Sequence, residues 1–182
     1  SNLSWKIAYC LKNNHSDKLL RTYQSERYSN VKEYIKTTAK MGEFVNAVGT
    51  SNITGKVSSA PDGQKSMKSI KPKLGKGLGK VQDKNRGKIF PQFKIRNGKS
   101  LDDKFSLKPI LILSKEIKNN ISSKLNSIQS KNNKDLEKFF KSSNSKAIIV
   151  RPDKFILSSC KSVKGFKSCL LYTSPSPRDV EE

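Results

Sequence analysis

The apolar residues of the first 46 positions fall into narrow stripes at helical spacing, and this limits what the chain can fold into. Leu3, Ile7 and Leu11 are four residues apart, which predicts a first helix with one apolar face. Residues 18–46 predict a second helix, and its stripe carries Leu20, Tyr23, Arg27, Val31, Tyr34, Ile35, Thr38, Met41 and Val45. Two such helices joined by a short turn form a hairpin, and each stripe needs a further surface to pack against.

The opposite face of the second predicted helix is polar. It carries Glu26, Asn30, Lys32 and Lys36. Ser16 and Asp17 offer an N-cap for this helix. Gly42 predicts a weakened C-terminal end, because glycine is a poor helix former.

A change of composition separates the hairpin from the rest of the chain. Residues 49–86 are rich in Lys, Gly, Ser and Pro, which predicts a linker or a long loop. Gly75, Gly77 and Gly79 alternate with other residues and lack the GxGxxG spacing of a dinucleotide-binding turn. No apolar strand precedes them, so the pattern does not predict a nucleotide site.

Residues 87–159 combine short apolar runs with helical patterns, which predicts a small α/β domain with a mixed sheet. Strands are expected at residues 89–95, 107–113, 147–150 and 155–157. Helices are expected at residues 115–128 and 135–141. Pro152 and Asp153 suit the central positions of a tight turn between the last two strands, and Asn97 and Gly98 are a second turn signal.

The chain carries a formal net charge of +22, which leaves two interpretations open. It has 37 Lys and Arg against 15 Asp and Glu, but only six of the 37 are Arg. Guanidinium groups dominate specific contacts to phosphates and bases. We therefore favour solvated surface lysines without a specific nucleic-acid partner. A basic nucleic-acid-binding protein is the alternative.

The sequence predicts no metal, disulfide or membrane-spanning site. Cys10, Cys160 and Cys169 form no CxxC pair, and His15 lies in a polar turn. The longest apolar run, residues 110–113, is far shorter than the ~20 residues of a membrane-spanning helix. These features fit a reducing, cytoplasmic setting.

The end of the chain has an unusual sequence. Residues 169–179 (CLLYTSPSPRD) resemble one translated reading frame of a transposase-type adapter used in sequencing libraries. We therefore expect residues 160–182 to be a mostly artefactual tail, and the natural protein to differ after about Ser168.

Three separated stretches resemble motifs of FAD-dependent aromatic-ring hydroxylases, in the same order as in that family. Residues 2–8 (NLSWKIA) are similar to its NLxWKLA helix, residues 19–27 (LLRTYQSER) to its LLxxYxxER helix, and residues 147–155 (AIIVRPDKF) to its VLVRPDxxV strand–turn–strand. Residues 87–92 (GKIFPQ) and 101–103 (LDD) are similar to elements that open its C-terminal domain. The stretches resemble in particular those of flavoprotein monooxygenases like 3-(3-hydroxyphenyl)propionate hydroxylase.

This resemblance implies a division of the chain and an activity for the complete protein. Residues 1–48 would be the last helices of a truncated FAD-binding domain, residues 49–86 a linker, and residues 87–159 a thioredoxin-like domain. The family hydroxylates phenolic or other aromatic substrates with FAD, NAD(P)H and O₂, and the cofactor carries the difficult chemistry. The chain would then be a C-terminal fragment that is inactive alone, and the complete enzyme could form a homo-oligomer.

The family's cofactor-binding motifs lie upstream of the matched stretches. We therefore expect no catalytic, cofactor-binding or metal-ligating residue in this chain. Trp5, Tyr23, Glu26 and Arg27 are expected to be structural and to dock the helical hairpin onto the missing FAD-binding domain.

Overall fold

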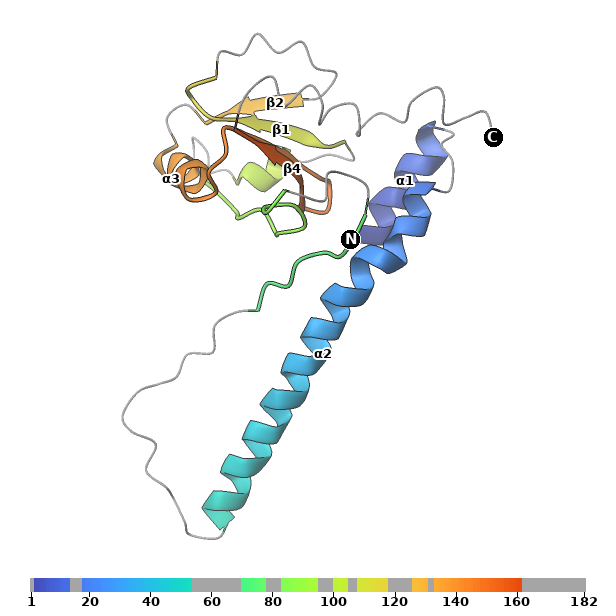
Figure 1. The fold of residues 1–182 in the computed structure, drawn as a ribbon, viewed down its shortest axis with the longest axis vertical. Helices are drawn as coiled ribbons and strands as arrows, with labels where there is room; N and C mark the ends of the chain where they lie inside the picture. The colour runs from blue at the N-terminus through green and yellow to red at the C-terminus, as the bar shows by residue number, and fades with distance from the viewer. Residues whose placement is uncertain are drawn as a thin grey trace.

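The protein consists of a helical pair and a separate α/β unit (Figure 1). The computed structural model describes residues 2–13, 18–53, 70–77, 83–94, 100–104, 108–117, 126–130 and 133–161. The elements are α1 (Asn2–Asn13), α2 (Lys18–Ile53), the 3₁₀ helix η2 (Leu101–Lys104), β1 (Ile110–Leu113), β2 (Asn126–Gln129), α3 (Lys134–Ser142), β3 (Ala147–Val150) and β4 (Ile156–Cys160). No helix in these ranges is long and apolar enough to cross a membrane.

The helical pair has the predicted order, but its second helix is longer than predicted. Helix α1 lies against the N-terminal part of α2, and the rest of α2 runs away from the α/β unit (Figure 1). Instead of ending near Asn46, α2 continues to Ile53. Gly42 does not end the helix, since glycine costs only about 1 kcal/mol relative to alanine and leaves every backbone hydrogen bond in place.

The α/β unit is built on the predicted mixed sheet, with strand order β2-β1-β3-β4. Strands β1 and β2 are parallel, and β3 is antiparallel to both β1 and β4. Residues 126–128 were predicted to end a helix, but they belong to β2 instead. Ile128 fits helical spacing and also pairs with Ile112 across the sheet, so a short apolar pattern could not distinguish the two structures.

The central strands are buried on both faces, which explains why their sequences are continuous apolar runs. One face of the sheet belongs to a cluster with α3, made by Phe90, Phe93, Leu101, Ile110, Ile112, Leu136, Phe140, Ile148, Val150 and Ile156. The other face carries a smaller cluster of Leu111, Leu113, Ile117, Ala147 and Ile149. Neither cluster contains a residue of α1 or α2.

The predicted strand at residues 89–95 does not form. Ile89 and Lys94 make only isolated bridges, to Phe155 and Ser100 respectively. Pro91 lies between them and has no N–H to donate to a ladder, which limits regular pairing. The side chains of Phe90 and Phe93 still point into the core, so the apolar spacing reports burial and not a strand.

The predicted turn at residues 151–154 is confirmed. The backbone N–H of Lys154 donates to the carbonyl of Arg151 at 2.9 Å, and the N–H of Arg151 donates to the carbonyl of Phe155 at 2.9 Å. Helix α3 is also confirmed, with the side chain of Asn133 as its N-cap. The predicted N-cap at Ser16 and Asp17 and the turn at residues 97–98 lie outside the described residues, as do His15 and the adapter-like tail.

Candidate functional site

A buried carboxylate joins the helical pair to the α/β unit. Glu26 of α2 is only 2% exposed and faces Arg151, the residue that follows β3. Arg151 Nη1 donates to Glu26 Oε1 at 2.8 Å and Nη2 donates to Oε2 at 2.9 Å. Such a bidentate pair fixes orientation as well as distance, because both groups are planar. We call this contact and its neighbours the joint.

Asp153 and Asn2 extend the joint on both sides of Arg151. Arg151 Nε and Nη2 donate to the two carboxylate oxygens of Asp153, at 3.0 and 2.7 Å. Asn2 Nδ2 donates to Glu26 Oε2 at 3.0 Å and to Asp153 Oδ2 at 2.9 Å. The first residue of α1 therefore connects a helix of the pair with the hairpin turn of the sheet.

Lys6 completes the charge balance of the joint. Its side chain is fully buried, and its Nζ lies 3.0 Å from Glu26 Oε2 and donates to Thr22 Oγ1 at 2.7 Å. The joint then holds two cations, Lys6 and Arg151, and two anions, Glu26 and Asp153. This balance matters because an unpaired buried charge costs several kcal/mol.

The protonation states follow from these contacts. Burial by itself raises the pKa of Glu26, but the hydrogen bonds and charge of Arg151 outweigh burial and place the pKa below its ordinary value of 4.5. Burial lowers the pKa of Lys6 from its ordinary value of 10.5, although the attraction of Glu26 opposes this change. Burial also acts to lower the pKa of Arg151, but its bonds to Glu26 and Asp153 raise it overall.

Trp5 covers the joint from the α1 side. Its ring lies 5.0 Å from the guanidinium carbon of Arg151, a cation–π contact. Within the described part of the chain, Trp5 Nε1 and Asn2 Oδ1 are buried without a hydrogen-bond partner. The first turn of α1 therefore has one donor and one acceptor that no described residue uses.

Part of the predicted linker packs tightly between the two regions. We call residues 70–77 the strap. The N–H of Gly75 donates to the carbonyl of Glu26 at 2.8 Å, and Asn30 Nδ2 donates to the carbonyl of Pro72 at 2.8 Å. The N–H of Leu74 donates to the carbonyl of Gly87, which ties the strap to the α/β unit.

The strap needs glycine because α2 fills the space beside it. A Cβ at Gly77 would lie 2.1 Å from Glu26 Oε1, and one at Gly75 would lie 2.3 Å from the carbonyl oxygen of Ser25. These glycines therefore permit close approach of the backbone to a helix. No space for a phosphate is left at either of them.

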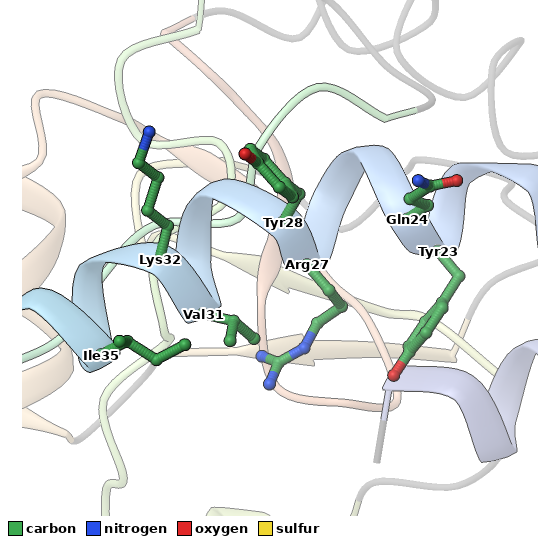
Figure 2. Close-up of a pocket in the computed structure, with 7 residues that line it drawn as sticks. All are labelled: Tyr23, Gln24, Arg27, Tyr28, Val31, Lys32 and Ile35. Carbon is green, nitrogen blue, oxygen red and sulfur yellow. The ribbon is translucent and has the colours of Figure 1, made fainter.

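Both helices of the pair leave their apolar stripes exposed. On α1, the exposed large apolar residues are Leu3, Ile7 and Leu11. On α2 they are Tyr23, Tyr28, Val31, Tyr34, Ile35, Met41 and Val45. Figure 2 shows the N-terminal part of the α2 stripe, where Tyr23, Gln24, Arg27, Tyr28, Val31, Lys32 and Ile35 line an open groove.

The structure corrects the role predicted for Glu26 and Trp5. Both were expected to dock the hairpin onto another domain, but they contact Arg151 of this chain. The reason is that the polar face of α2, with Glu26 and Asn30, packs toward the strap and the α/β unit. Tyr23 and Arg27 lie on the open side instead and line the groove.

Sequence reasoning missed Lys6 and Arg151 as members of the joint. The signal that could have pointed to them is their position inside two of the three family-like stretches, residues 2–8 and 147–155. Their pairing could not be read from the chain, since Glu26 and Arg151 are 125 positions apart.

The described residues of the joint contact one another through ion pairs and hydrogen bonds. No group of three or more His, Cys, Asp and Glu in them could hold a metal ion. The carboxylate of Glu26 is engaged by Arg151, Lys6 and Asn2, so it has no free position to accept a proton from a substrate.

Comparisons with known proteins identify the fold. No protein-family model and no curated protein sequence matches the chain. Among solved structures it resembles RebC-10x with bound 7-carboxy-K252c (TM-score 0.61, 14% identity, covering 94% of this chain and 39% of that one). It also resembles the substrate-free rebeccamycin biosynthetic enzyme RebC (TM-score 0.57, 14% identity, covering 95% of this chain and 38% of that one).

A third similar structure carries a flavin. It is the ternary complex of aklavinone-11 hydroxylase with FAD and aklavinone (TM-score 0.52, 14% identity, 94% of this chain and 38% of that one). The chain therefore shares its fold with a part of each of these enzymes, and it spans less than two-fifths of their length.

Proposed function

We propose that this chain is part of an FAD-dependent monooxygenase that hydroxylates a phenolic or other aromatic substrate with NAD(P)H and O₂. The observation that carries the proposal is the fold shared with aklavinone-11 hydroxylase over 94% of the chain. The ordered sequence stretches at residues 2–8, 19–27 and 147–155 support it independently. They form the N-terminal turns of both helices and the Arg151 hairpin, which are the elements that meet at the joint.

The described residues do not fit FAD. The strap is the only glycine-rich segment among the described residues. The space beside its glycines is filled by Ser25, Glu26 and Ser29 of α2. The groove on α2 is open and lined by residues of one helix. A dinucleotide needs a glycine turn that leads into a helix N-terminus. In this proposal FAD, the reductant and the aromatic ring are therefore held by parts of a longer polypeptide, and no catalytic residue lies in this chain.

The proposed task of this part is architectural. The joint fixes the α/β unit on the helical pair, and the exposed stripes leave the pair an apolar surface for the FAD-binding part. We propose that the α/β unit is thioredoxin-like in fold but has no redox function, because the sequence contains no CxxC pair. Cys10, Cys160 and Cys169 form no CxxC pair, which supports the proposed reducing, cytoplasmic location.

The test is to express the complete reading frame that contains this chain and to record its absorption spectrum. We expect a flavin spectrum, and NAD(P)H oxidation that a phenolic compound stimulates with the formation of a product heavier by one oxygen atom. A colourless protein that cannot be reconstituted with FAD would rule out the proposal. Salt-sensitive binding to nucleic acid by that colourless protein would favour the alternative.

A further inference from the structure

The groove on α2 has two rows of side chains that differ in character. Tyr23, Arg27, Val31 and Ile35 point to one side of the helix in Figure 2, and Gln24, Tyr28 and Lys32 point to the other. Val31 is 37% exposed and Ile35 is 64% exposed, although both have the apolar character of core residues. Residues 23–35 cover about 18 Å of helix at 1.5 Å per residue, which is enough for one partner element.

The charged groups that line the groove are both cations. Arg27 donates a hydrogen bond to Asn30, and Lys32 lies 6.0 Å from the ring centre of Tyr28. No acidic side chain lines the groove, and no described carboxylate forms an ion pair with either cation. Burying Arg27 under an apolar partner without a carboxylate would be costly. A stable partner surface must therefore supply negative charge beside its apolar residues.

The same groove on a second copy of the chain does not meet this requirement. Residues 18–46 carry six Lys and Arg against three Glu, and one of these, Glu26, is buried in the joint. Two α2 grooves face to face would bring Arg27 and Lys32 against the same cations of the other copy. Like charges at an interface disfavour association by several kcal/mol.

We propose that the groove of residues 23–35 is an intramolecular docking surface for an apolar segment of the longer polypeptide that carries an Asp or Glu opposite Arg27. This inference rests on the proposed function, because it needs the additional chain. The similar enzymes are longer than this chain, which spans only 38–39% of their length, so a longer polypeptide of this kind has additional chain to fill the groove. The chemistry of the occupant follows from the groove: apolar contact with Val31 and Ile35, and an ion pair with Arg27.

The direct experiment places a photo-crosslinking amino acid at Val31 in the complete protein. We expect an intramolecular crosslink to a segment outside residues 1–182 that contains Asp or Glu within a few positions. A crosslink to a second copy, or none at all, in a protein that binds flavin would overturn the inference and leave the proposed function standing. The expected crosslink in a protein without flavin would overturn the proposed function alone.

A charge-reversal variant of Arg27, with a matched control variant, tests the proposed ion pair. Arg27→Glu in the complete protein is expected to increase the rate of limited proteolysis within α2 about tenfold, equivalent to about 1.4 kcal/mol. Lys36→Glu is the matched control, because it makes the same charge change on an exposed residue of α2 outside the groove. Arg27→Gln should give a smaller increase, and it covers the case in which Arg27→Glu fails to fold. Equal rates for Arg27→Gln, Lys36→Glu and the unmodified protein would overturn the proposed ion pair.

Discussion

The α/β unit and the helical pair bury opposite kinds of side chain. In the α/β unit, β1 and β3 place apolar residues on both faces of the sheet, and the two apolar clusters are closed. In the helical pair, the fully or nearly fully buried residues are mainly polar, and they include Asn2, Lys6, Glu26 and Asn30. The apolar stripes of α1 and α2 are exposed, so the pair has its apolar surface on the outside.

This difference separates two physical roles. Burial of apolar area is non-directional and provides most of the stability of a fold. Buried ion pairs contribute little net stability, since desolvation offsets their attraction, but they require one geometry. We therefore expect the α/β unit to be stable through its own apolar core. The joint instead sets the angle at which α1 and α2 expose their apolar stripes.

The largest expected effect comes from breaking the joint at its centre. Arg151→Met leaves Glu26 and Asp153 buried without their main partner, so we expect a loss of about 3–5 kcal/mol in the free energy of unfolding of the joint. Trp5 is the only tryptophan and lies against Arg151, so its fluorescence in a urea titration reports the joint directly. The protection of the β1 and β3 backbone amides from hydrogen exchange should be lost at higher urea than the Trp5 signal.

The double variant Arg151→Met with Glu26→Leu is the control for this prediction. It removes the central pair from both sides, so part of the lost stability should return. A double variant that is as unstable as the sum of the two single variants would show that Glu26 and Arg151 are not energetically coupled.

The next effect lies in the α/β unit. Ile148→Ala removes a fully buried side chain between α3 and the sheet and should cost about 2–5 kcal/mol. Unlike Arg151→Met, it should lower the urea midpoint of β1 and β3 amide protection more than that of Trp5 fluorescence. Equal shifts in both signals would mean that the two regions unfold as one cooperative unit. That result would contradict the separate roles of the α/β unit and the joint.

Acid should weaken the joint before the sheet. The pKa of Glu26 is lower in the folded protein than its ordinary value of 4.5, so the stabilisation it provides is complete above pH 4.5 and is lost as the pH falls through the folded value. Trp5 fluorescence should therefore change below pH 4.5 before the β1 and β3 amides lose their protection from hydrogen exchange. Glu26→Gln should remove this acid-dependent step, and an unchanged titration in that variant would assign it to another group.

The smallest expected effect concerns the strap. Gly77→Ala places a methyl group against the Glu26 carboxylate and should cost about 1–3 kcal/mol, seen as a lower urea midpoint of Trp5 fluorescence. Gly42→Ala is the matched control, because open space surrounds that position in α2. Alanine there should stabilise the helix by up to about 1 kcal/mol. Equal effects at both positions would argue against close packing of the strap.

Local patterns predicted much of the fold because short-range chemistry decides those elements. Helix α3 and strand β3 follow from their own side chains, and Pro152 with Asp153 determined the turn between β3 and β4. The strand β2 was predicted as the end of a helix, because its single central apolar residue, Ile128, suits either structure. The pairing of β2 with β1 needs a neighbour that is distant in the sequence.

The joint could not be predicted in the same way. Glu26 was placed correctly on the polar face of α2, opposite its apolar stripe, but a polar face is usually solvated and its burial is decided by what packs there. Likewise, Gly75 and Gly77 were read as linker residues, and only the approach of α2 explains why no side chain is allowed at either position.

By itself the sequence determined the helical pair with its one-sided apolar stripes, the mixed α/β unit and the tight turn after β3. Periodicity and turn chemistry act over a few residues, so they can be read from the chain. The tertiary structure alone decided that the stripes face outward and that Glu26, Lys6, Arg151 and Asp153 meet between the two regions. Glu26 and Arg151 are 125 positions apart, so no local pattern brings them together, and their pairing depends on how the helical pair packs against the α/β unit.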